Sequence, residues 1–138
     1  MLEAATGRAL FDQGRTAEAG ATLSRLEAER GDMLPRTEIV TAGLRARLAS
    51  AAGSHDRAAT AARRAADLSS ATDDPYLAGA ALFDLAVVMK AGGRAAEAAA
   101  AAAAALERFE AKGASLPASR VRDWLAPAAG EPGGSARA

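Results

Sequence analysis

Serine, histidine and aspartate stand side by side at Ser54-His55-Asp56. These are the residue types of a hydrolase triad, in which the serine attacks, the histidine takes its proton and the aspartate orients the histidine. Triad members meet in space from separate segments, and three adjacent residues cannot bring the reacting groups into line. The stretch also lies at a predicted turn between helices, where serine and aspartate cap helix starts. We therefore interpret it as a capping sequence.

Carboxylate pairs occur at Asp73-Asp74 and at Glu27 and Glu29. Such a pair performs acid–base chemistry only in a pocket that separates the two pKa values. We assign the first pair to helix capping and the second to a solvated helix face. His55 is the single histidine and cysteine is absent, which excludes multi-histidine and thiolate metal sites. Phosphate-binding glycine motifs are absent too. The sequence predicts neither an enzyme nor a cofactor or metal.

The charges are balanced and interspersed, with 17 basic and 17 acidic residues among 138. The one basic doublet, Arg63-Arg64, has Asp67 close by. Nucleic-acid binding needs a concentrated cationic face, so we expect no nucleic-acid partner. The first residues lack the apolar core of a signal peptide, and the apolar runs are short and interrupted, so we expect no membrane contact. The absence of cysteine fits a reducing compartment, and we expect a soluble, cytoplasmic protein.

Helix-forming residues dominate, and no stretch alternates apolar and polar residues over the length of a strand. Asp74 before Pro75 marks a helix start, and Gly31, Gly92 and Gly113 mark helix ends. The tail 127–138 has no apolar pattern and is predicted to be disordered. Seven helices are predicted, over residues 2–13, 15–30, 36–52, 55–70, 75–91, 94–112 and 117–126.

Three of the breaks between these helices share one pattern, a glycine followed five residues later by an alanine. The glycines are 39 and 40 residues apart, and this agreement indicates an internal repeat. A repeated hairpin cannot bury its apolar face alone, so each hairpin must stack on its neighbours. Small residues let helices approach closely, which explains the uninterrupted run from Ala98 to Ala105 as a thin, wedged helix. The glycine–alanine pairs are Gly14 and Ala19, Gly53 and Ala58, and Gly93 and Ala98.

Residues 1–126 resemble the tetratricopeptide repeat. Gly7, Ala46 and Ala86 match the small residue midway along that family's first helix, and Ala65 and Ala105 match a second small position, where Leu26 departs from the pattern. The units here are longer than the family's usual period of about 34 residues. The resemblance implies an all-α fold, a right-handed α-solenoid of three hairpins. These span 2–30, 36–70 and 75–112, with a capping helix over 117–126 in which Trp124 is a packing anchor.

The stretch from Asp73 to Ala126, with "ALFDLAVVMKAGGRAAEA" and "LERFEAKG", resembles the carboxy-terminal repeats of large bacterial signalling proteins. Those proteins carry an ATPase module, often with a nucleotide cyclase or a helix-turn-helix domain. The resemblance implies a non-catalytic protein–protein interaction module of a bacterial regulatory system, cut from or descended from a larger chain. The first hairpin then lacks the repeat that normally covers it, and we expect homo-oligomerisation through that exposed face.

The resemblance also implies that ligands lie in a concave groove lined by the first helix of each hairpin. Arg8 and Arg47 hold equivalent places in successive units, and two guanidinium groups on one wall suit a carboxylate of a protein or peptide partner. In an alternative interpretation both arginines are solvated and balanced by Asp12. The alternative function is a sensor whose groove closes on a peptide or small anionic ligand. The implied groove residues are Arg8, Phe11, Arg47, Ser50, Phe83, Val87 and Lys90.

Overall fold

The computed structural model describes residues 2–29 and 34–126, and within these ranges the chain is all-α, as predicted. The helix bounds differ from the predicted ones by at most two residues, for example at Ala28, where the second helix ends. The predicted tail 127–138 and the predicted helix end at Gly31 lie outside the described residues. No helix in the described ranges has the length and apolar character needed to cross a bilayer. The helices are α1 (Leu2–Asp12), α2 (Thr16–Ala28), α3 (Pro35–Ala51), α4 (His55–Ser70), α5 (Pro75–Ala91), α6 (Ala95–Lys112) and α7 (Ser115–Leu125).

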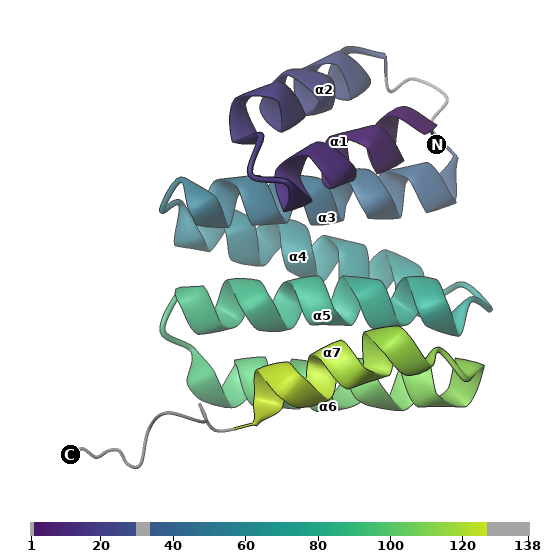
Figure 1. Cartoon of the computed structure of the whole chain (residues 1–138). Helices are drawn as coiled ribbons and strands as arrows, with labels where there is room; N and C mark the ends of the chain where they lie inside the picture. The colour runs from purple at the N-terminus through teal and green to yellow at the C-terminus, as the bar shows by residue number, and fades with distance from the viewer. Residues whose placement is uncertain (1, 30–33, 127–138) are drawn as a thin grey trace.

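Consecutive helices pair into stacked hairpins (Figure 1). α1 packs on α2, α3 on α4, and α5 on α6, while α7 packs on α6. The first helices also contact one another, α1 with α3 and α3 with α5, and form what we call the front layer. The second helices α2, α4 and α6 form the back layer. Because the hairpins stack in chain order, side chains far apart in sequence meet along the front layer.

The turns inside the hairpins repeat one backbone geometry. Gly14, Gly53 and Gly93 have φ values of 80°, 83° and 82°, in the left-handed region that glycine adopts without a Cβ clash. In each turn the amide after the glycine donates to the carbonyl five residues earlier; Ser54 donates to Ala49 at 2.9 Å. Gly113, with φ 74°, makes the same turn between α6 and α7. The glycines that recur in the sequence therefore mark recurring copies of this turn.

The alanine run of α6 has a buried and an exposed side. Ala98 and Ala105, the positions expected to be thin, are 2 % and 0 % exposed. Ala101 and Ala102 are also buried, among side chains of α5, α6 and α7. The small side chains keep α6 close to both neighbouring helices. On the other side, Ala99, Ala100 and Ala103 are exposed.

Two predicted helix caps have different outcomes. Asp74 accepts a hydrogen bond from the Leu77 amide at 3.0 Å, with Pro75 in the first turn of α5, which confirms this start. Ser54 occupies the cap position of α4, but its side chain makes no capping hydrogen bond. The side-chain capping predicted for Ser54 is therefore wrong. The physical reason is its backbone: the turn holds Ser54 at ψ 70°, away from the extended conformation that aims a capping oxygen at the first amides of a helix.

Candidate functional site

A cleft of about 670 Å³ lies on the surface of the front layer, where α1, α3, α5 and α7 meet with Phe109 of α6. We call it the front cleft. Aliphatic and aromatic side chains form its floor, and arginines from three helices lie along it. It is lined by Arg8, Asp12, Arg36, Ile39, Val40, Arg47, Tyr76, Leu77, Ala80, Ala81, Phe83, Asp84, Phe109, Pro117 and Arg120.

At one end of the front cleft, two arginines hold a single buried carboxylate. Asp84 is only 4 % exposed. Arg8 contacts both of its oxygens, Nη1 to Oδ2 and Nη2 to Oδ1, each at 3.0 Å, in the bidentate geometry typical of arginine with carboxylate. Arg47 Nη1 donates to Oδ1 at 2.8 Å. The carboxylate that the paired arginines suit is therefore supplied by the chain itself.

Gly43 makes room for this cluster. A Cβ at position 43 would lie 2.6 Å from Oδ2 of Asp84, closer than any unstrained contact. The missing side chain lets the carboxylate lie directly against α3, within reach of Arg8 on α1 and Arg47 on the same helix. This small residue thus serves an ion cluster as well as helix packing.

The two arginines have further partners. Arg8 Nε contacts Oδ1 of Asp12 at 3.1 Å, so the pair expected in the alternative interpretation is also present. Burial alone would lower the pKa of Arg8, but the charge and hydrogen bonds of Asp84, followed by those of Asp12, outweigh burial and raise this pKa above its ordinary value. The guanidinium of Arg47 lies 5.6 Å from the ring centroid of Phe11, a cation–π distance. Both side chains are therefore fixed within the protein.

Two aromatic pairs lie at or beside the front cleft. The rings of Phe83 and Trp124 meet edge to face with centroids 5.7 Å apart, and Lys90 Nζ lies 4.9 Å from the Trp124 centroid. Trp124 thus anchors α7 on α5, in agreement with the predicted packing role. Tyr76 packs against Phe109 with centroids 5.6 Å apart, yet remains 46 % exposed. Such a half-covered ring presents apolar area and a hydroxyl to a binding partner.

Two cations at the front cleft remain accessible. Arg36 forms an ion pair with Asp74, and its side chain is half exposed. The hydrogen bond from Arg36, followed by that from the Leu77 amide, holds the pKa of Asp74 below its ordinary value. Arg120 is exposed and forms no ion pair within residues 2–29 and 34–126. Arg120 is therefore the cation most available to an anionic group that enters the cleft.

The groove residues implied by the sequence have different positions. Arg8, Arg47 and Phe83 line the front cleft, and Phe11 adjoins it beneath Arg47. Lys90 lies beyond Phe83, against Trp124. Ser50 and Val87 are half-buried and do not line the cleft.

The front-cleft residues that sequence reasoning missed include Tyr76, Asp84 and Arg120. The signal for Asp84 was present. It is the one charged residue between Leu77 and Met89, and a charge at a buried helix position requires a partner of opposite charge.

Among the described residues, no group of three or more histidine, aspartate or glutamate side chains is placed to hold a metal ion. Asp84 accepts hydrogen bonds from two permanently charged guanidinium groups, an arrangement that fixes structure and does not position a general base. Comparisons with protein-family models, with curated proteins and with solved structures find no match for this chain. The geometry of the surface is therefore the basis for assigning a function.

Proposed function

We propose that this chain is a non-catalytic interaction module that binds a segment of a partner protein in the front cleft. The observation that carries the proposal is the combination of an apolar floor, a half-exposed aromatic ring at Tyr76 and an accessible cation at Arg120. Aromatic and arginine side chains are the residues on which binding energy most often concentrates. Every lining residue of the cleft lies on a helix, so binding a segment there requires little reordering of the backbone.

The handedness of the stack, the repeat family and the cellular setting are part of the same proposal. We infer a right-handed, tetratricopeptide-like α-solenoid that acts in the cytoplasm of a bacterial regulatory system. The repeated glycine turns, the buried alanines that follow them and the stacked hairpins support the architecture. The absence of cysteine supports the compartment. The coding sequences next to this one test the regulatory setting, which predicts an ATPase, cyclase or DNA-binding module among them.

A sensor of small anionic ligands is the second candidate. It is favoured by the bidentate arginine geometry around a carboxylate at one end of the front cleft. In the structure Asp84 occupies that geometry, so a free anion must compete with an intramolecular one. We therefore rank the binding of a protein segment above that of a small anion.

Peptide selection tests the proposal. A random peptide library displayed on phage is selected on the immobilised full chain, and recovered peptides are measured by calorimetry. We expect peptides that carry an aromatic or aliphatic residue beside aspartate or glutamate. Tyr76→Ala and Arg120→Glu should each weaken them at least about tenfold, as expected for loss of an anchor side chain. Arg108→Glu, at an exposed position of α6 outside the cleft, is the matched control.

Circular dichroism of each variant confirms that the helices are retained before binding is compared. Selected peptides that bind both cleft variants as tightly as the control contradict the proposal. A selection that enriches no peptide above the bare support also contradicts it.

Self-association is the other expected partnership. Along α1 and α2, the described outward-facing side chains are mainly alanine, polar or charged, among them Ala5, Ala9, Ala17 and Ser24. Such a surface offers little apolar area, so we expect any self-association through it to be weak. Light scattering over a range of protein concentrations tests self-association, and a mass that rises with concentration supports it.

A further inference from the structure

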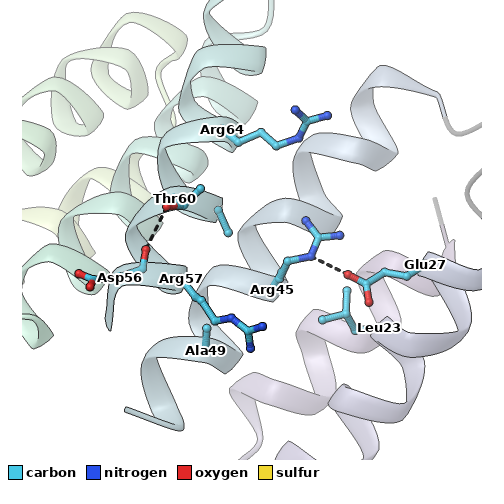
Figure 2. A pocket seen from close by; sticks show the side chains of 9 residues that line it. Leu23, Glu27, Arg45, Ala49, Asp56, Arg57, Thr60 and Arg64 are labelled. Atoms are coloured by element: carbon cyan, nitrogen blue, oxygen red, sulfur yellow. Dashed lines mark hydrogen bonds and ion pairs between the residues drawn. The ribbon is translucent and has the colours of Figure 1, made fainter. Parts of the chain in front are cut away.

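A second cleft, of about 650 Å³, lies between α2, α3 and α4 and shares no lining residue with the front cleft (Figure 2). We call it the back cleft. Its apolar floor includes Leu23 and Ala61, both largely buried. Figure 2 shows the guanidinium groups of Arg45, Arg57 and Arg64 extending from α3 and α4 over the side where α2 lies. Three cations thus surround a small apolar floor.

The interval between α2 and α4, at the back cleft, corresponds to the interval between α4 and α6 one hairpin further along the stack. There, ion pairs join α4 with α6 and with Arg94, the residue just before α6. Arg63 Nη2 lies 3.0 Å from Oε2 of Glu97, and Arg94 Nη2 lies 3.6 Å from Oδ1 of Asp56. Carboxylates of each helix therefore neutralise arginines of the other.

The same register between α2 and α4 lacks these pairs. Ser24 lies ten residues after its turn glycine, Gly14, which is the position of Arg63 in the second hairpin. Arg57 lies four residues after Gly53, which is the position of Glu97 in the third hairpin. An arginine thus stands where the third hairpin has a glutamate, and a serine stands where the second has an arginine. Arg57 is exposed and forms no ion pair with any described residue. The interval between α2 and α4 therefore has a cation without a carboxylate.

The other charges around the back cleft leave this imbalance in place. Arg45 donates through Nε to Oε2 of Glu27 at 2.6 Å, a bond that does not use its two terminal nitrogens. Arg64 is paired with Glu38. Asp56 also lines the cleft, but its carboxylate points away from the arginines and toward the third hairpin (Figure 2). An incoming carboxylate therefore meets donors on Arg45 and Arg57.

We propose that the back cleft binds an acidic segment of a partner protein. A carboxylate of that segment pairs with Arg57 and the terminal nitrogens of Arg45, while an adjacent apolar side chain covers Leu23 and Ala61. This is the chemistry that α6 offers to α4 one hairpin along, where a glutamate and small apolar residues lie together. A nucleic acid fits less well, because its affinity grows with the number of phosphates neutralised and only one cation here lacks a counter-charge. The site shares only α3 with the front cleft, and it adds to the proposed function.

The test uses a short fluorescein-labelled peptide of glutamate, leucine and alanine, titrated with the full chain and followed by fluorescence anisotropy. We expect saturable binding that weakens as salt is added, since the recognised charges are exposed. Arg57→Gln should weaken it about tenfold, the scale of a lost charge-assisted hydrogen bond. Arg57→Glu, which installs the residue type of the third hairpin, should weaken it further. The matched control is Arg108→Gln, at an exposed arginine of α6 that also lacks an ion pair in the described chain.

Other outcomes overturn the proposal. Equal affinity for wild type and Arg57→Gln removes the cleft as the site, and equal affinity for a peptide with glutamine in place of glutamate removes the charge argument. Competition by inorganic phosphate or by a single-stranded oligonucleotide at concentrations equal to the peptide's assigns the cleft to other anions. Tyr76→Ala, in the front cleft, should leave this affinity unchanged, so failure here is separable from failure of the proposed function.

Discussion

Arg8 of α1 holds Asp84 of α5 through two parallel contacts of 3.0 Å, although 76 positions separate the two residues in the chain. Arg47 of α3 adds a third contact to the same carboxylate. One buried acid thereby connects the first helices of all three hairpins. Neighbouring hairpins also pack through apolar side chains such as Leu44 and Ile39, and this buried cluster adds a directional contact between them.

Asp84→Ala should reduce the free energy of unfolding by about 2 kcal/mol or more, because two guanidinium groups lose their shared counter-charge. Breaking a fully buried pair costs about 3–5 kcal/mol. The expected loss is smaller here because the side chains of Arg8 and Arg47 are 29 % and 19 % exposed. Urea unfolding followed by circular dichroism measures the change. Asp12→Ala removes the exposed partner of Arg8 and should cost less than about 1 kcal/mol; equal losses from the two variants contradict the cluster's role.

Gly43→Ala and Gly20→Ala should change stability in opposite directions. A Cβ at position 43 would strike the Asp84 carboxylate, and we expect a loss of about 1–3 kcal/mol from overpacking. A Cβ at position 20, inside α2, would meet nothing within 4 Å. Replacing that helical glycine should stabilise the protein by about 0.5–1 kcal/mol. Thermal unfolding of both variants measures the difference, and a stabilising Gly43→Ala is inconsistent with the carboxylate lying against α3.

Leucine substitutions divide the alanine run into required and tolerated positions. Ala105→Leu should destabilise the protein by about 1–3 kcal/mol, because Ala105 is fully buried and the new side chain overfills the contact. Ala103→Leu should be nearly neutral, because Ala103 is exposed and leucine is a good helix former. Melting temperatures of the two variants provide the measurement. Similar melting temperatures for the two variants would contradict a need for small side chains where α6 contacts α5 and α7.

Asp74→Ala should cost about 1 kcal/mol at neutral pH through loss of the cap of α5. The pKa of Asp74 is lowered in the folded state, so its stabilisation is complete above the ordinary carboxyl value of about 4 and is lost as pH falls through the folded pKa. The difference between wild type and variant should therefore shrink as the pH is lowered below about 4. Unfolding curves at several pH values measure it, with Asp73→Ala as the neighbouring control. A difference that grows toward acid reverses the expected sign.

Local chemistry in the sequence was sufficient for the helices and turns. A left-handed glycine, a proline after an aspartate and a buried alanine at a fixed offset act within a few residues of the chain. The turns at Gly14, Gly53 and Gly93 were therefore visible before any fold was known. The capping role of Ser54 could not be predicted in the same way, because it depends on the ψ angle that the preceding turn imposes.

The binding surfaces depend on contacts between helices. Arg8 and Arg47 were recognisable as a pair, but their carboxylate comes from the third hairpin, and only stacking brings Asp84 to them.

The sequence shows one basic doublet, Arg63-Arg64. In the structure the two side chains of this doublet diverge, because successive residues of a helix point about 100° apart. Arg63 pairs with Glu97 on α6, whereas Arg64 lies at the back cleft. The sequence by itself determined the repeated hairpins, and the tertiary structure decided which charges are neutralised and which remain open to a partner. Neutralisation requires a few ångströms of proximity between elements, and that proximity arises only when the helices pack.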